Sequence, residues 1–104
     1  MQSARNFLTP DALTMLQTIA SAGSFAAAAR EMGMVPSALT YRVRQIEDAL
    51  DVLLYDRSSR QAKLTEAGAE LLREAHRLLE DIDAVAKTVN RETTASQQTQ
   101  TYDD

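Results

Sequence analysis

One short stretch of the chain carries side chains that could read the edges of nucleic-acid bases. Ser37, Thr40 and Tyr41 offer hydroxyl groups, and Arg44 offers a guanidinium group. If residues 36–50 form a helix, a rotation of about 100° per residue points these four side chains to one side. Such groups on an exposed helix can hydrogen-bond to base edges in the major groove of DNA. The stretch therefore predicts an outward helix face that is polar, partly basic and chemically suited to DNA.

A second group of cationic side chains follows in residues 51–65. Arg57, Arg60 and Lys63 lie in and beside a turn-like stretch between two short apolar segments, which is the pattern of a small β-hairpin. Cations near the tip of a hairpin can bind phosphates or enter the minor groove. The net charge of −4 does not oppose this, because residues 1–65 contain seven basic and six acidic side chains, whereas the remaining residues contain four and nine.

The sequence lacks the combinations of residues that catalysis or metal binding would need. It contains no cysteine and one histidine, His76, which lies away from the apolar side of its helix and is expected to be exposed. Glu80, Asp81 and Asp83 do not converge on a divalent ion and are interpreted as a solvated face. No nucleophile–base pair, glycine-rich phosphate loop or carboxylate dyad occurs. We therefore expect no enzyme activity, no metal and no cofactor.

Length and hydropathy indicate one small soluble domain. The chain has 104 residues, of which 44% are hydrophobic, as in ordinary globular proteins. No apolar run approaches the ~18 residues of a membrane span, and the N-terminus lacks the layout of a signal peptide. The sequence thus predicts a cytoplasmic protein with no membrane contact.

Capping and stop residues define the first helices. Thr9 can cap a helix that starts with Pro10 and stops at Gly23, and Ser24 can cap a second helix that stops at Gly33. A third helix, over 36–50, follows directly. Its apolar positions are spaced four, three and four apart and form a narrow buried stripe made of Leu39, Val43, Ile46 and Leu50.

The remaining segments complete a mainly α fold. Residues 54–65 are expected to form the two-stranded hairpin, residues 66–90 a long helix, and residues 91–104 a disordered tail. Three short helices plus a two-stranded wing, followed by a long dimerisation helix, describe a winged helix-turn-helix over residues 8–65. Periodicity alone also allows a generic helical bundle whose third helix has an ordinary solvated face.

Four blocks of sequence favour the winged helix-turn-helix. They are, in chain order, Ser24-Phe25-Ala26-Ala27-Ala28-Ala29, Leu39-Thr40-Tyr41-Arg42-Val43-Arg44-Gln45-Ile46-Glu47, Leu54-Tyr55-Asp56-Arg57-Ser58-Ser59-Arg60 and Leu64-Thr65-Glu66-Ala67-Gly68. In their order and spacing, residues 8–90 resemble the N-terminal DNA-binding region of LysR-type transcriptional regulators. The resemblance implies a helix-turn-helix over about 25–44, a wing ending near Thr65, a linker helix that pairs two subunits, and binding to two-fold related sites upstream of promoters.

The chain departs from this family in several places. Many members begin the recognition helix with Ser-Gln-Pro, where this chain has Val35-Pro36-Ser37, so the hydroxyl cap is missing and Pro36 replaces a Gln that often reads bases. Tyr41 stands where an Arg is frequent, and Arg42 is displaced one position toward the buried side. The family's ligand-sensing domain of two α/β lobes is absent. The chain is therefore expected to be an excised fragment or a naturally short protein, with no small-molecule ligand in this region.

The long helix carries an apolar stripe suited to a partner helix. Part of the stripe can pack on the first helix, but a helix of about 37 Å outruns a three-helix domain. The half from Leu78 to Val89 is therefore expected to be exposed in a monomer and covered in a homodimer. The predicted dimerisation residues are Leu71, Ala75, Leu78, Leu79, Ile82, Val85 and Val89.

Two functions remain open at this point. The first is sequence-specific binding of double-stranded promoter DNA by a homodimer, with a higher oligomer left open for a full-length form. The second is a short interaction protein that forms mixed dimers with longer regulators through the linker helix. Tyr41 is either a base-contacting aromatic or plain surface cover. The predicted DNA-contacting residues are Ser24, Pro36, Ser37, Thr40, Tyr41, Arg44, Arg57, Arg60 and Lys63.

Overall fold

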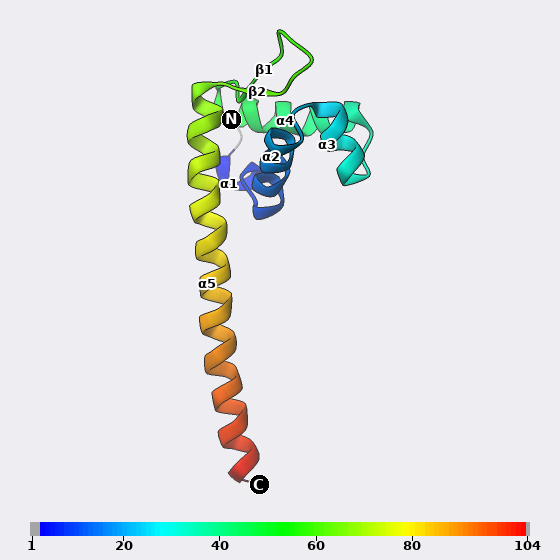
Figure 1. Ribbon diagram of the computed structural model, residues 1–104. Coiled ribbons are helices and arrows are strands. Elements are labelled where there is room, and N and C mark those ends of the chain that lie inside the picture. The colour runs from blue at the N-terminus through cyan, green and yellow to red at the C-terminus, as the bar shows by residue number, and fades with distance from the viewer. Residues whose placement is uncertain (1–2, 104) are drawn as a thin grey trace.

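The chain forms a small helical domain from which one long helix projects (Figure 1). The computed structural model describes the backbone of residues 3–103 and the side chains of residues 3–92. The molecule measures 65 × 30 × 22 Å, and its long dimension follows the last helix. In chain order the elements are α1 (Ala4–Phe7), α2 (Pro10–Ala22), α3 (Phe25–Met32), α4 (Pro36–Leu50), β1 (Tyr55–Asp56), β2 (Lys63–Leu64) and α5 (Glu66–Asp103).

The ends of α2 and α3 follow the capping residues that the sequence indicates. The Thr9 hydroxyl accepts a hydrogen bond from the backbone N–H of Ala12 at 3.1 Å, and the Ser24 hydroxyl accepts one from Ala27 at 3.0 Å. Gly23 ends α2 in the left-handed conformation, with φ of +86°, which a glycine adopts without steric cost. The three predicted short helices are confirmed.

The core lies where α2, α3 and α4 meet. The largest buried aliphatic side chains include Leu16 and Ile19 from α2 and Leu39 and Val43 from α4. The wing closes this core through Tyr55, which is 1% exposed and whose hydroxyl donates to the Leu16 carbonyl oxygen at 2.6 Å. Burial, reinforced by the negative charge of Glu47, raises the pKa of Tyr55, so the phenol stays protonated and keeps donating.

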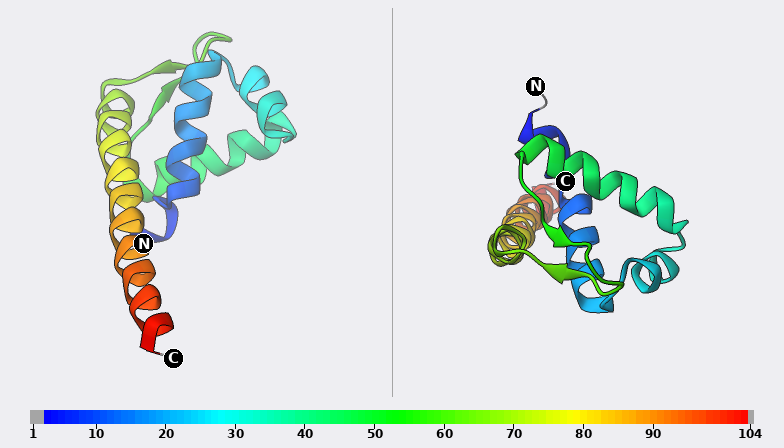
Figure 2. Two further views of the ribbon diagram at one scale, coloured as in Figure 1. Left: turned by 60° about the horizontal axis from the view of Figure 1, so that its bottom comes forward. Right: turned by 90° about the horizontal axis from the view of Figure 1, so that it is seen from above.

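The wing is a minimal antiparallel pair in which Tyr55 faces Leu64 and Asp56 faces Lys63. Thr65 is the single residue between β2 and α5, and the view from above in Figure 2 shows the hairpin running directly into the long helix. The Thr65 backbone N–H donates to the Leu54 carbonyl at 3.0 Å, while its hydroxyl donates to the Leu53 carbonyl at 2.6 Å and accepts from the N–H of Gly68 at 3.0 Å. The start of α5 is therefore tied to the chain entering β1.

Two features differ from the sequence-based expectation. A four-residue helix, α1, precedes α2 and packs against α4. It is too short to show any apolar periodicity. The long helix continues to Asp103 where an end at Asn90 and a disordered tail are expected. No proline or glycine follows Gly68, so nothing in the backbone interrupts the helical hydrogen bonds.

Candidate nucleic-acid interface

The outward face of α4 brings together the side chains that the sequence predicts to read DNA. Ser37, Tyr41 and Arg44 are exposed and Thr40 is half-buried, whereas the stripe on the opposite side is buried in the core. Tyr41 is 64% exposed, and its phenol oxygen accepts a hydrogen bond from the Gln45 side chain at 3.3 Å. This bond holds the ring on the helix surface with most of its area accessible to a ligand.

The N-terminal end of α4 lacks a side-chain cap, as the sequence indicates. Val35 occupies the cap position and makes no side-chain hydrogen bond, and Pro36 begins the helix. Proline suits this position because the first turn needs no donor there. Pro36 and Ser37 are both exposed at this end, next to Tyr41.

The structure corrects the expectation for Arg42. Its side chain is exposed rather than turned toward the core, and it lines a small depression with Asn6, Phe7 and Gln45. Arg42 lies on the flank of α4 that faces α1, whereas Glu47 lies on the flank that faces the wing. The wing covers the flank of Glu47, whereas the flank of Arg42 stays open to solvent.

The cations of the wing have different surroundings. Arg60 lies in the exposed tip and has no ion-pair partner among the described residues. Lys63 is exposed and stands opposite Asp56 in the hairpin. The pKa of Asp56 is lowered by hydrogen bonds from Ser58, with a smaller contribution from the charge of Lys63. Arg60 is therefore the cation with most of its charge uncompensated.

Arg57 does not point freely into solvent. Its guanidinium group donates to the carboxylate of Glu47 at 3.0 Å and lies 5.3 Å from the centre of the Phe25 ring. The pairing of Arg57 with Glu47 is not predicted by the sequence. The only signal available was an acidic residue directly after Ile46, at the edge of the buried stripe of α4.

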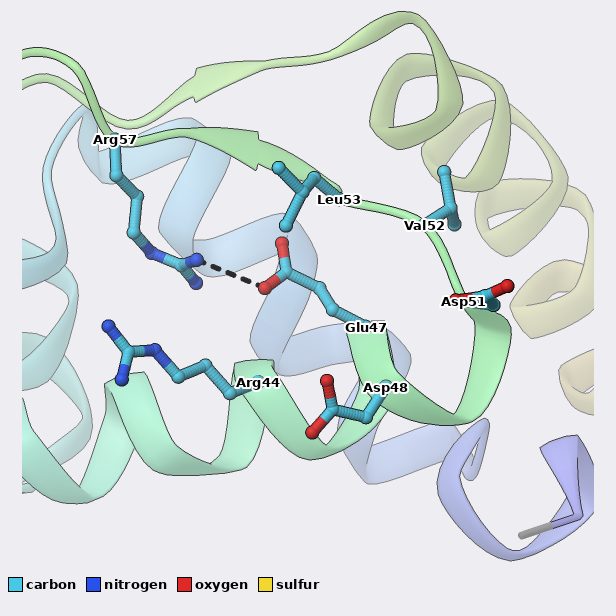
Figure 3. Close-up of a pocket in the computed structure, with 7 residues that line it drawn as sticks. All are labelled: Arg44, Glu47, Asp48, Asp51, Val52, Leu53 and Arg57. Atoms are coloured by element: carbon cyan, nitrogen blue, oxygen red, sulfur yellow. Dashed lines mark hydrogen bonds and ion pairs between the residues drawn. The ribbon is translucent and has the colours of Figure 1, made fainter. Parts of the chain in front are cut away.

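Arg44 and Arg57 line one pocket between α4 and the wing (Figure 3). Its volume is about 530 Å³, and the other charged residues that line it are Glu47, Asp48 and Asp51. Three carboxylates around two guanidinium groups do not form an anion-binding site. DNA contact by Arg44 is therefore expected at the outward face of α4 rather than inside this pocket.

Ser24 has a structural role of its own. Its hydroxyl oxygen accepts from the N–H of Ala27, which satisfies one of the unpaired donors of the first turn of α3. The side chain is half-buried. Contact with DNA at Ser24 is thus expected from the remaining hydroxyl proton or the neighbouring backbone.

The apolar stripe of α5 is divided between two environments. Ala75 is fully buried and Leu71 packs on the core, because this part of α5 lies against α2. Beyond it the stripe is exposed, and Leu78, Ile82, Val85 and Val89 are between 45% and 62% accessible. Leu71 and Ala75, expected as dimerisation residues, are therefore occupied within the subunit. The exposed far half agrees with the expectation for a monomer.

The part of the chain that the structure describes contains neither a membrane-spanning helix nor a metal-ligand cluster. Within residues 3–103, no helix combines the length and apolarity needed to cross a bilayer. Among the side chains of residues 3–92, no group of three or more histidine and acidic residues is placed to hold a metal ion. His76 is exposed, with its Nε2 atom 3.4 Å from a carboxylate oxygen of Glu80.

Three short helices, an exposed polar face on the third and a two-stranded wing define a winged helix-turn-helix. The family model described as bacterial regulatory helix-turn-helix protein, lysR family, matches residues 10–69. The chain belongs to this family and carries the DNA-binding domain of a LysR-type transcriptional regulator.

Individual relatives agree with this assignment. Over 76 residues the chain is 49% identical to the probable HTH-type transcriptional regulator YhaJ of Escherichia coli strain K12. This match covers 73% of the chain and 26% of YhaJ. Among solved structures, full-length LysG from Corynebacterium glutamicum with bound effector Arg shows 32% identity and a TM-score of 0.67, covering 81% of this chain and 29% of LysG. The chain thus spans about a quarter of the length of the curated relatives it matches.

The fold is also shared with a solved DNA-binding domain. In the complex of the BenM DNA-binding domain with catB site 1 DNA, that domain is similar to this chain with a TM-score of 0.73. The similarity covers 81% of this chain and 93% of that one, at 24% identity. At this identity the comparison supports the fold alone.

Proposed function

We propose that the protein binds double-stranded promoter DNA as a homodimer and recognises two-fold related half-sites. The observation that carries the proposal is the exposed face of α4, which presents hydroxyl, aromatic and guanidinium groups beside a wing with an uncompensated cation. A helix of this kind fits the major groove, while a wing contacts the adjacent backbone or minor groove. Binding to chromosomal DNA implies a location in the cytoplasm.

Each part of the interface has a separate task in this proposal. The side chains that share the outward face of α4 contact base edges. They are Ser37, Thr40, Tyr41 and Arg44. Asp48 lies further along the same face and repels phosphates, so contact is confined to the N-terminal half of the helix. The remaining contacts expected from the sequence, to the DNA backbone or minor groove, are Ser24, Pro36, Arg57, Arg60 and Lys63, of which Arg57 is already engaged by Glu47.

The proposed homodimer is formed by the far half of the α5 stripe. A depression lined by Leu78, Asp81, Ile82 and Val85 offers an apolar surface to a second helix. Pairing two α5 helices about a two-fold axis would place both α4 helices on one side of a DNA duplex. Higher oligomers are proposed only for a full-length form.

The alternative, a short protein that acts by forming mixed dimers without binding DNA, is less well supported. The family match covers the helix-turn-helix and the wing, which an interaction protein would not need. Fluorescence anisotropy titration with promoter fragments separates the two functions. Binding to a palindromic duplex supports the proposal, and dimerisation without DNA binding supports the alternative.

Arg60→Ala is expected to reduce the salt dependence of DNA binding. Each neutralised phosphate contributes about −0.9 to the slope of log affinity against log salt concentration. Loss of one contact should therefore make the slope shallower by about 0.9 per subunit. The slope is measured by anisotropy at several salt concentrations. The control is Arg77→Ala, which removes the same charge from α5, where Arg77 pairs with Glu74, and should leave the slope unchanged.

Tyr41→Ala and Thr40→Ala are expected to change sequence preference rather than affinity for all DNA. A good base contact discriminates by about 1–3 kcal/mol, or roughly 5- to 150-fold. The ratio of dissociation constants for specific and random duplexes measures this effect. Tyr41→Phe keeps the ring and removes the hydroxyl, so it separates stacking from hydrogen bonding. Equal losses on both duplexes would mean that these residues only position the helix.

A further inference from the structure

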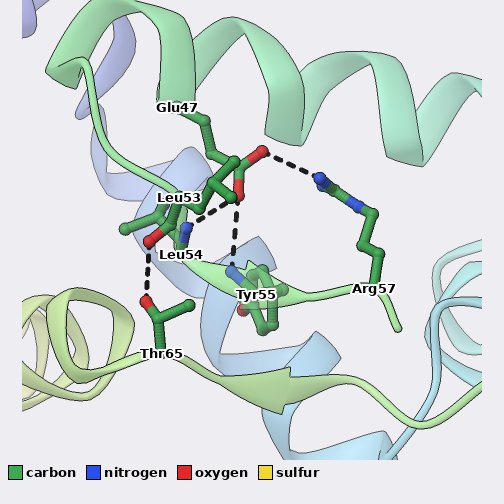
Figure 4. A network of polar contacts seen from close by, with 6 residues as sticks. All are labelled: Glu47, Leu53, Leu54, Tyr55, Arg57 and Thr65. Atoms are coloured by element: carbon green, nitrogen blue, oxygen red, sulfur yellow. Dashed lines mark hydrogen bonds and ion pairs between the residues drawn. The ribbon is translucent and has the colours of Figure 1, made fainter. Parts of the chain in front are cut away.

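The carboxylate of Glu47 is buried between the recognition helix and the wing (Figure 4). Only 4% of the residue is exposed. One carboxylate oxygen accepts hydrogen bonds from the backbone N–H groups of Leu54 at 2.7 Å and Tyr55 at 3.3 Å. The other oxygen accepts from the Arg57 guanidinium at 3.0 Å. The Glu47 side chain of α4 therefore binds both the backbone at the start of β1 and the guanidinium group of Arg57, the residue directly after β1.

Arg57 extends this connection to α3. Its guanidinium lies over the ring of Phe25, the first residue of α3, at 5.3 Å from the ring centre. Phe25 in turn packs edge-on against Tyr55, with ring centres 5.4 Å apart and an interplanar angle of 79°. Arg57, which belongs to the wing, therefore contacts both α4 through Glu47 and α3 through Phe25.

A second attachment holds the other side of the wing. The backbone N–H of Ala62, just before β2, donates to the carbonyl oxygen of Gly23 at 2.9 Å. Residues 58–61, which include Arg60, therefore project between two attachment points, Arg57 on one side and Ala62 on the other. The position of Arg60 relative to α4 depends on both.

The charge of Glu47 makes its role testable. A carboxylate near a DNA-binding surface weakens binding through repulsion of phosphates. On this electrostatic ground alone, removing it should strengthen DNA binding. If Glu47 instead sets the position of the wing, removing its charge should weaken DNA binding. The two roles predict changes of opposite sign.

We propose that Glu47 and Arg57 are positioning residues, which hold the wing at a fixed orientation to α4 so that Arg60 reaches the DNA backbone while α4 occupies the major groove. This inference rests on the proposed DNA-binding function. It reassigns Arg57 from a phosphate ligand to a support of the wing, because its guanidinium is engaged by Glu47 and Phe25.

The first test compares Glu47→Gln with Asp48→Asn. Both variants remove one negative charge from neighbouring positions of α4, but Asp48 is exposed and its carboxylate has no hydrogen-bond or ion-pair partner among the described residues. The Gln amide keeps one acceptor oxygen and places a donor group against other donors, so the pairing with Arg57 is lost. We expect roughly tenfold weaker binding to a palindromic duplex for Glu47→Gln and equal or tighter binding for Asp48→Asn.

Binding is measured at a temperature where circular dichroism shows both variants to be folded. Equal or tighter binding by folded Glu47→Gln would overturn the proposal. If Glu47→Gln does not fold, Arg57→Met provides the test, since it removes the guanidinium group, keeps an unbranched side chain at this position and leaves both backbone N–H bonds to Glu47 in place.

The second test locates the effect on the DNA by hydroxyl-radical footprinting. The positions whose protection Arg60→Ala removes define the contact of the wing. We expect Arg57→Met to weaken protection at these same positions and to retain the protection due to α4. Loss of protection at a different phosphate, with the Arg60-dependent positions intact, would make Arg57 a direct phosphate ligand and overturn the proposal. Failure of the proposed function is distinguishable, because then the wild type itself would protect no duplex.

Discussion

Replacing Leu78 and Ile82 with glutamate is expected to dissociate the dimer and to reduce binding to palindromic DNA at the same time. Both side chains are about half exposed on the far part of α5 and line the apolar depression proposed as the dimer contact. Burying carboxylates in an apolar helix contact costs about 3 kcal/mol or more, which is a change of at least roughly 100-fold in the dimer dissociation constant. Analytical ultracentrifugation measures the dissociation constant directly.

A matched control places the same two charges on another side of the helix. His76→Glu combined with Ala84→Glu changes exposed residues away from the apolar stripe and should leave the dimer intact. DNA affinity for a palindrome should fall only for the variant that dissociates. A wild type that remains monomeric at roughly tens of micromolar, a concentration at which specific dimers are populated, would contradict the proposed dimer.

Gly68→Ala is expected to destabilise the fold strongly, even though alanine favours helices. A Cβ atom at position 68 would lie 2.1 Å from the carbonyl oxygen of Leu54 and 3.0 Å from its carbonyl carbon. These are backbone atoms, and the same carbonyl oxygen already accepts from Thr65, so it cannot rotate away. The first turn of α5 would have to move off the wing. We expect a loss of ~3 kcal/mol in unfolding free energy and a fall of roughly 15 °C in Tm.

Thermal unfolding followed by circular dichroism checks this result. Helix propensity alone predicts the opposite sign, with alanine stabilising an internal helix position by about 1 kcal/mol over glycine. Gly33→Asn is the control, since a Cβ atom there meets no atom within 4 Å and asparagine tolerates the positive φ of +65°. Its effect should stay below about 1 kcal/mol. A higher Tm for Gly68→Ala would show that α5 does not approach Leu54 this closely.

Helix α5 takes part in two separate contacts, one at its start and a proposed one in its far half. At its start, Thr65 and Gly68 fix the helix to the wing, and through Glu47 the wing is fixed to α4. At its far half the exposed stripe is the proposed contact with a second subunit. The distance between two α4 helices in a dimer therefore depends on both ends of α5. Half-site spacing on the DNA follows from this distance.

The amino-acid sequence by itself determined α2, α3, α4, the start of α5, the wing and the face of α4 that points outward. Thr9, Gly23 and Ser24 act through hydrogen bonds and backbone angles within four residues of their own position, so their effect is visible in the sequence. The stripe of Leu39, Val43 and Ile46 likewise predicts its own burial through its spacing. For the same reason the outward positions of Tyr41 and Arg44 follow from the sequence.

Only the tertiary structure decided which polar and small residues meet across elements. As a cation in a turn-like stretch, Arg57 is predicted from the sequence to bind phosphate. Its guanidinium group is instead paired with Glu47, ten positions earlier in the chain. Gly68 matters because a carbonyl group 14 residues away lies against it. Arg42 and Glu47 flank the same buried stripe of α4, but only Glu47 is buried, because the wing packs against its side of the helix. Periodicity describes one element and its solvent-facing side. It does not describe which backbone groups of another element a side chain will reach, because that depends on how the elements pack.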